Sequence, residues 1–92
     1  MTLENRFLKY VSFDTQSDEN SDTYPSTLKQ SIFLKALADE MRQIGLSDVE
    51  MDNYGYVMGT IPASAGLENA PVIGFISHVD TSPEISGKDV NP

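Results

Sequence analysis

The chain has 92 residues, 39% of them hydrophobic, which is room for one small domain with a modest core. Its 14 acidic and 6 basic residues give a net charge of −8, so it offers no basic patch for nucleic acid or for an anionic membrane surface. It has no cysteine for a disulfide or thiolate zinc site, and no apolar stretch near the roughly 20 residues that a membrane-spanning helix needs. We therefore expect a cytoplasmic protein with neither a nucleic-acid nor a membrane partner.

The first half of the chain predicts two amphipathic helices. Apolar residues recur at helical spacing over residues 2–12 and again over residues 27–44. The polar and acidic segment 13–24 between them predicts a solvated loop. The expected core stripe of the second helix consists of Leu28, Ile32, Phe33, Ala36, Leu37, Met41 and Ile44.

Residues at both ends of the second helix support these limits. Thr27 and Gln30 have the spacing of a capping box, and Ser26 is the alternative cap. Gly45 suits the left-handed conformation in which many helices end. The helix is therefore expected to span about Thr27 to Ile44.

Two β features follow the helices. Segments 49–53 and 56–61 predict the strands of a half-buried hairpin, with its turn at Tyr54-Gly55. Segment 72–76 is apolar at consecutive positions, which is typical of an interior strand covered on both faces. Because such strands usually belong to sheets flanked by helices, we predict an α/β fold with two helices, a β-hairpin and a central sheet strand.

The single histidine of the chain, His78, follows the predicted central strand. Ligands of open α/β sheets bind beyond the carboxyl ends of the strands, and Asp80 shares one side of an extended chain with His78. A carboxylate that accepts a hydrogen bond from one ring nitrogen leaves the other nitrogen free for a metal ion. The alternative is a histidine that caps a strand, with Asp80 in the turn, because a catalytic zinc site typically needs three protein ligands.

The sequence around this pair resembles a known family. Residues 73–83, Ile-Gly-Phe-Ile-Ser-His-Val-Asp-Thr-Ser-Pro, are similar to the first metal-site motif of the peptidase T family. That family comprises tripeptide aminopeptidases within the wider group of two-zinc exopeptidases and deacylases. Residues 6–12, 14–17, 25–27 and 87–92 also resemble the family, so the resemblance covers essentially the whole chain.

The resemblance implies a metal-binding role for His78 and a catalytic role for Asp80. His78 would be a terminal ligand of one of two zinc ions, and Asp80 would orient His78 without binding metal. The substrate would be a tripeptide with a free amino terminus, from which the first residue is released. In the family, a bridging aspartate, a general-base glutamate and the remaining ligands lie downstream.

The resemblance also implies that residues 1–92 are the N-terminal portion of a catalytic domain. The rest of that domain, and a smaller lid domain through which family members form homodimers, would lie outside this chain. We therefore expect residues 1–92 alone to be inactive. Two alternatives stay open, namely a non-catalytic α/β module that associates with a partner or with itself, and a related zinc dipeptidase or deacylase.

Overall fold

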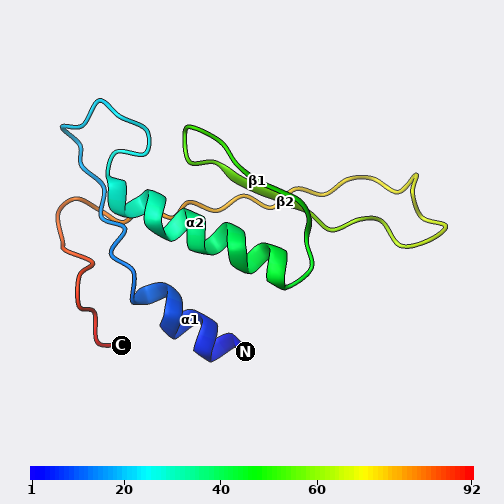
Figure 1. Ribbon diagram of the computed structural model, residues 1–92, viewed down its shortest axis with the longest axis horizontal. Coiled ribbons are helices and arrows are strands. Elements are labelled where there is room, and N and C mark those ends of the chain that lie inside the picture. Colours follow the sequence, from blue (N-terminus) through cyan, green and yellow to red (C-terminus); the bar gives the residue numbers. More distant parts are fainter.

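The computed structural model describes residues 1–92 and has a small α/β fold (Figure 1). In chain order, the elements are helix α1 (Leu3–Val11), helix α2 (Leu28–Gln43), strand β1 (Ser47–Met51) and strand β2 (Val57–Thr60). The two predicted helices and the hairpin are confirmed, with ends within two residues of those expected. Neither helix has the length and apolar character that crossing a membrane requires.

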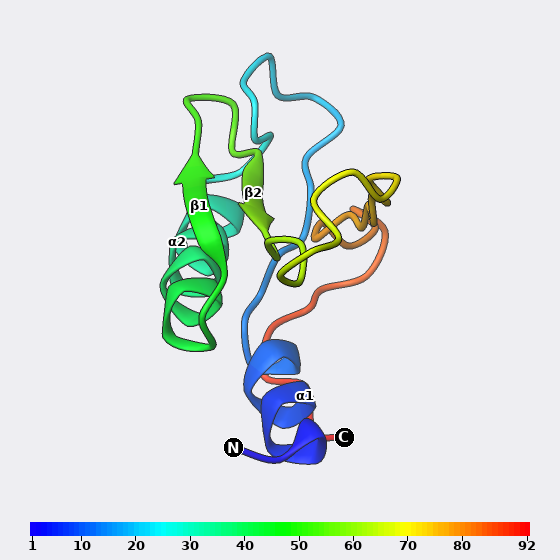
Figure 2. The same cartoon turned by 90° about the vertical axis from the view of Figure 1, so that its right-hand side faces the viewer.

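The two strands form one antiparallel sheet that packs against α2 (Figure 2). The register pairs Met51 with Val57 and Ser47 with Thr60, and an irregularity lies between them at Asp48, whose φ is +53°. The hairpin turn depends on Gly55, which has a φ of +84° and passes so close to Pro25 that a Cβ atom would lie 2.7 Å from its Cγ. Only glycine fits this approach without a shift of its neighbours.

Helix α2 is the centre of the fold, with the hairpin on one side and α1 on the other (Figure 1). The buried apolar residues are Phe33, Leu34 and Ala38, all on α2. The ring of Phe33 contacts Tyr10 of α1 edge-on, with ring centroids 5.5 Å apart, and Phe13 at 5.0 Å. The apolar core is therefore one short row on α2 rather than a layer between two sheets.

The core stripe predicted for α2 is wrong at three positions. Leu28, Ile32 and Ile44 are 78%, 58% and 54% exposed, whereas Leu34 and Ala38 are buried. Helical periodicity identifies apolar residues, but burial also needs a neighbouring element. In this chain only the row around Phe33 has neighbours on both sides.

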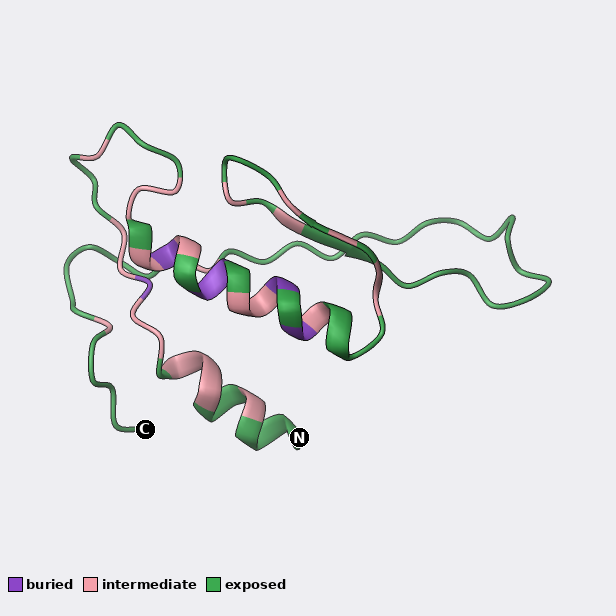
Figure 3. Ribbon diagram, in the orientation of Figure 1, coloured by how far each residue is buried: buried purple, intermediate pink, exposed green.

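The central strand predicted over residues 72–76 does not form in this chain. The segment pairs with no other strand, and Val72, Phe75 and Ile76 are 96% to 100% exposed. Figure 3 shows the same exposed state along the whole path from the hairpin to this segment. The physical reason is the lack of a partner, because a strand needs a neighbour to take up its backbone hydrogen bonds, and here β1 and β2 pair only with each other.

The start of α2 uses its predicted capping residues differently from a capping box. Thr27 is the N-cap residue, but its side chain does not bond to the helix backbone. Its hydroxyl instead donates to the carbonyl of Gln16 at 2.9 Å and accepts a hydrogen bond from Nε2 of Gln30 at 3.0 Å. Nε2 of Gln30 also donates to the hydroxyl of Ser26 at 3.0 Å. The side chains at the start of α2 therefore connect the helix to the preceding loop.

At the other end of α2, Gly45 follows the helix with a φ of +100°, as predicted.

A buried carboxylate joins α1 to α2. Glu40 of α2 is 5% exposed and accepts a hydrogen bond from the hydroxyl of Tyr10 and another from Nζ of Lys9 at 3.4 Å. Nε of Arg6 lies 3.6 Å from the same carboxylate. The hydrogen bond from Tyr10, followed by the nearby cations, lowers the pKa of Glu40. Burial and then the contact with Glu40 raise the pKa of Tyr10 to about 12.

This pairing predicts an alkaline loss of stability that depends on Tyr10. A raised pKa in the folded state means that the stabilisation is fully present below the usual tyrosine pKa of about 10 and is lost as the pH rises towards 12. Tyr10→Phe should lower the free energy of unfolding by about 1–2 kcal/mol at pH 8, and this deficit should shrink between pH 10 and 12. Urea unfolding at several pH values measures the deficit. Tyr54→Phe, which changes an exposed tyrosine, is the control. A Tyr10→Phe deficit that is constant with pH would contradict the pairing.

Candidate metal-ligand site

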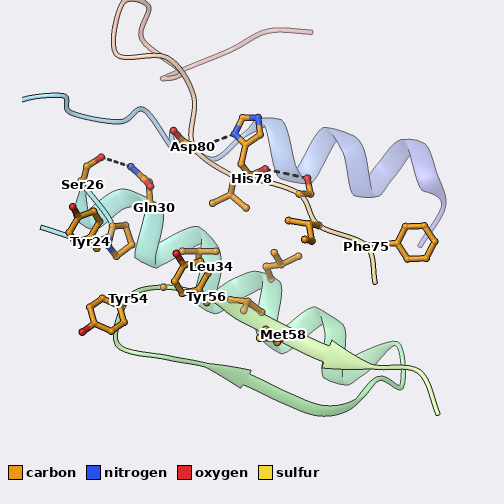
Figure 4. Close-up of a pocket in the computed structure, with 17 residues that line it drawn as sticks. Tyr24, Ser26, Gln30, Leu34, Tyr54, Tyr56, Met58, Phe75, His78 and Asp80 are labelled. Carbon is orange, nitrogen blue, oxygen red and sulfur yellow. Dashed lines mark hydrogen bonds and ion pairs between the residues drawn. The ribbon is translucent and has the colours of Figure 1, made fainter. Parts of the chain in front are cut away.

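His78 and Asp80 form a hydrogen-bonded pair on the segment that precedes the C-terminal loop (Figure 4). Nδ1 of His78 lies 2.9 Å from Oδ1 of Asp80. An ionised carboxylate can only accept a hydrogen bond, so a neutral His78 carries its hydrogen on Nδ1 and leaves the lone pair of Nε2 free. The side chains are 83% and 49% exposed, so the free nitrogen is accessible.

The pair lies at one edge of an open groove of about 1000 Å³. The groove runs between the first half of α2, the hairpin turn and the segment from Phe75 to Asp80 (Figure 4). Its floor includes the apolar side chain of Leu34, and the ring of Phe75 points away from it. His78 is therefore at the boundary between an apolar groove and solvent.

The backbone next to the pair is fixed by one parallel β-bridge. Thr81, the residue after Asp80, pairs with Gln16. Its N–H donates to the carbonyl of Thr15 at 3.1 Å, and its carbonyl accepts hydrogen bonds from the N–H of Ser17 at 3.0 Å and from the Ser17 hydroxyl at 2.8 Å. The bridge places the turn that follows the His-x-Asp motif against the loop between the two helices.

The sequence did not identify this loop as part of the site. Residues 13–24 were expected to form a solvated loop, but Thr15 is 5% exposed and the segment around it pairs with Thr81. The expectation holds better for residues 18–20 and 22–24, which are exposed. No local pattern signals the pairing, because the partners are more than 60 residues apart in the sequence.

The donor set of this chain fits one ligand of a metal site. No three histidine, aspartate or glutamate side chains lie close enough together to hold an ion. His78 has the chemistry of a single zinc ligand, since an imidazole nitrogen is free and the other is held by a carboxylate. The zinc-ligand role of His78 and the orienting role of Asp80 stay predictions.

Comparison with known proteins places the chain beside peptidase T. No protein-family model matches it. Among curated proteins, peptidase T of Clostridium acetobutylicum is 60% identical over 87 residues, that of Caldanaerobacter subterraneus 54% over 87 residues, and that of Parabacteroides distasonis 52% over 92 residues. These matches include 95% to 100% of the chain but 21% to 22% of each relative. The predicted resemblance is confirmed, and the chain spans about a fifth of the length of the curated relatives it matches.

The contact between His78 and Asp80 predicts which ring nitrogen carries the hydrogen in neutral His78. The unmodified chain should have a larger Nδ1–H population than an unstructured histidine peptide, because Asp80 accepts from that nitrogen. Asp80→Ala should remove the excess, and ¹⁵N NMR of the single histidine measures it directly. Glu84→Ala changes an acidic residue of the same loop whose side chain makes no hydrogen bond. It should leave the ratio of the Nδ1–H form to the Nε2–H form of His78 unchanged. Equal ratios in all three proteins would rule out the pairing.

Proposed function

We propose that this chain is the part of a zinc-dependent tripeptide aminopeptidase that supplies the metal ligand His78. The observation that supports this most is the free Nε2 of an accessible imidazole whose Nδ1 is held by Asp80. The 60% identity to a peptidase T across 95% of the chain supports the reaction class. The same proposal includes a peptide substrate, the cytoplasm as compartment and a homodimer as assembly.

The two residues have different tasks in this proposal. His78 gives the Nε2 lone pair to one metal ion, and Asp80 keeps the ring hydrogen on Nδ1 and fixes the orientation of the imidazole. Zinc, when bound, supplies a Lewis acid that polarises the scissile carbonyl and activates a water molecule. We assign the other ligands and the general base to the rest of a protein as long as its relatives. Residues 1–92 alone are accordingly proposed to be inactive.

A second candidate function is an association module, and the exposed apolar segment favours it. Val72, Phe75 and Ile76 are almost completely exposed, and an unpaired apolar strand is a template for pairing with another chain. The two functions lead to different results in a protein of the length of the relatives. A metallopeptidase releases amino acids and needs its metal, whereas an association module does neither.

Replacing His78 tests the proposed function in a protein of that length which contains this chain. His78→Ala should lower kcat/KM for a tripeptide by at least about 100-fold, because losing a direct ligand should cost no less than losing its orienting partner. Asp80→Asn should lower it by about 10- to 100-fold. A chelator should abolish hydrolysis, and added zinc should restore it. The measurements are amino-acid release and bound zinc per chain, and Glu84→Gln is the control.

Two results would decide against this function. A His78→Ala protein with full zinc content and full activity would remove His78 from the metal site. An unmodified protein that cleaves no tripeptide with zinc present would favour the association module. Dipeptides and N-acyl amino acids in the same assay separate the tripeptidase from a related dipeptidase or deacylase.

A further inference from the structure

The segment that contains His78 and Asp80 is tied to the rest of the molecule at one end only. From Val72 to Asp80, the hydrogen bonds are Ser77 Oγ to the carbonyl of His78, at 3.3 Å, and the His78–Asp80 contact. No hydrogen bond joins residues 72–80 to another segment of the chain. The first such bonds are those of Thr81. The location of the pair relative to α2 therefore depends on how firmly Thr81 is held.

Gln16 lies at the centre of the contacts that hold this region. Its backbone is the partner of Thr81 in the parallel bridge. Its side-chain Nε2 donates to the carbonyl of Pro83 at 2.9 Å, whereas the backbone hydrogen bonds to Thr81 come from its two neighbours, Thr15 and Ser17. Its carbonyl accepts from the hydroxyl of Thr27, which connects it to the start of α2. Gln16 is thus the link between α2 and the turn that follows the His-x-Asp motif.

Lys29 of α2 sets the orientation of the Gln16 side chain. Nζ of Lys29 lies 3.4 Å from Oε1 of Gln16 and 2.9 Å from Oδ2 of Asp14. The other carboxylate oxygen of Asp14 accepts from the N–H of Gln16 at 3.0 Å. With Oε1 facing the ammonium group, the amide nitrogen of Gln16 is directed to Pro83. The hydrogen bond from Lys29, together with the one from Gln16, lowers the pKa of Asp14, so this carboxylate stays ionised around neutral pH.

We propose that Gln16, oriented by Lys29, is a positioning residue for the His78–Asp80 pair. This inference rests on the proposed function, because it assumes that the backbone pairing of Thr81 positions a metal ligand, His78. Gln16 has no hydrogen bond to His78 or Asp80, and it acts through its side-chain hydrogen bond to Pro83, two residues after the bridge at Thr81. The Lys29 and Asp14 side chains are 37% and 22% exposed, and ion pairs at such a surface contribute little to global stability. A change at Lys29 should therefore affect the turn more than the fold.

The first test uses the 92-residue chain and needs no enzymatic activity. Lys29→Met should speed the hydrogen exchange of the Thr81 and Ser17 amides by about tenfold, as expected when one hydrogen bond is weakened. Lys29→Arg should restore slow exchange, because a guanidinium group can reach the same two acceptors. Lys35→Met is the matched control, since Lys35 is an exposed lysine of the same helix without an ion pair. Circular dichroism confirms that α2 is retained.

Gln16→Ala is the second variant, which keeps the inference testable if Lys29→Met does not fold. It should also speed the hydrogen exchange of the Thr81 and Ser17 amides. In a protein of the length of the relatives, Lys29→Met should weaken zinc binding by about tenfold and lower kcat, with KM changed less than about twofold. A merely structural role for Lys29 would lower the amount of folded enzyme without changing the zinc affinity of what remains.

The outcomes separate this inference from the proposed function. Unchanged exchange of Thr81 in Lys29→Met and Gln16→Ala would overturn the positioning role, whatever the activity of the longer protein. Faster exchange with unchanged zinc affinity would also overturn the positioning role, since the pairing of Thr81 would then stabilise the loop without affecting His78. A His78→Ala protein that keeps its zinc would overturn the proposed function while leaving the exchange result intact.

Discussion

The backbone pairing of Thr81 with Thr15–Ser17 is the constraint on which the site depends. After β2 the chain makes a long excursion without a helix or a strand, and it returns to the helical part of the molecule at Thr81 (Figure 1). A loop of that length costs closure entropy, which the contacts at its end must offset. Three hydrogen bonds to the backbone of Thr81 do this at the residue that follows Asp80.

Polar contacts add to the ring contacts of Phe33 in holding α1 and the loop after it against α2. The buried apolar row on α2 is short, and two of the buried residues around it are Gln30 and Glu40. Gln30 fixes the start of α2, and Glu40 gathers three side chains of α1. Buried polar groups are costly unless they are paired, so each of these contacts also specifies one arrangement. The orientation of α1 and of the loop after it therefore depends on hydrogen-bond geometry as well as on ring packing.

The sequence predicted the features that depend on neighbouring residues. Helical periodicity located α1 and α2, Gly45 marked the end of α2, and the turn at Gly55 located the hairpin. The spacing of His78 and Asp80 predicted two side chains on one side of the chain, and they lie within hydrogen-bond distance. All of these signals come from residues within one element or one turn.

Features that join distant segments could not be predicted in this way. The pairing of Gln16 with Thr81 leaves no periodic pattern, and the buried Thr15 lies in a stretch whose composition is typical of a solvated loop. The hydroxyl of Thr27 accepts a hydrogen bond from Nε2 of Gln30 instead of a helix N–H, and it donates to the carbonyl of Gln16. The apolar segment 72–76 shows the opposite case, where a clear strand pattern remains unpaired because no neighbouring strand is present.

Anomalous diffraction at the zinc edge, from crystals of a protein of the length of the relatives, tests the assignment of His78 most directly. We predict a zinc ion bonded to Nε2 of His78, with Asp80 on Nδ1 and Thr81 still paired with Gln16. A zinc ion bound elsewhere, or a His78 that binds through Nδ1, would contradict the assignment.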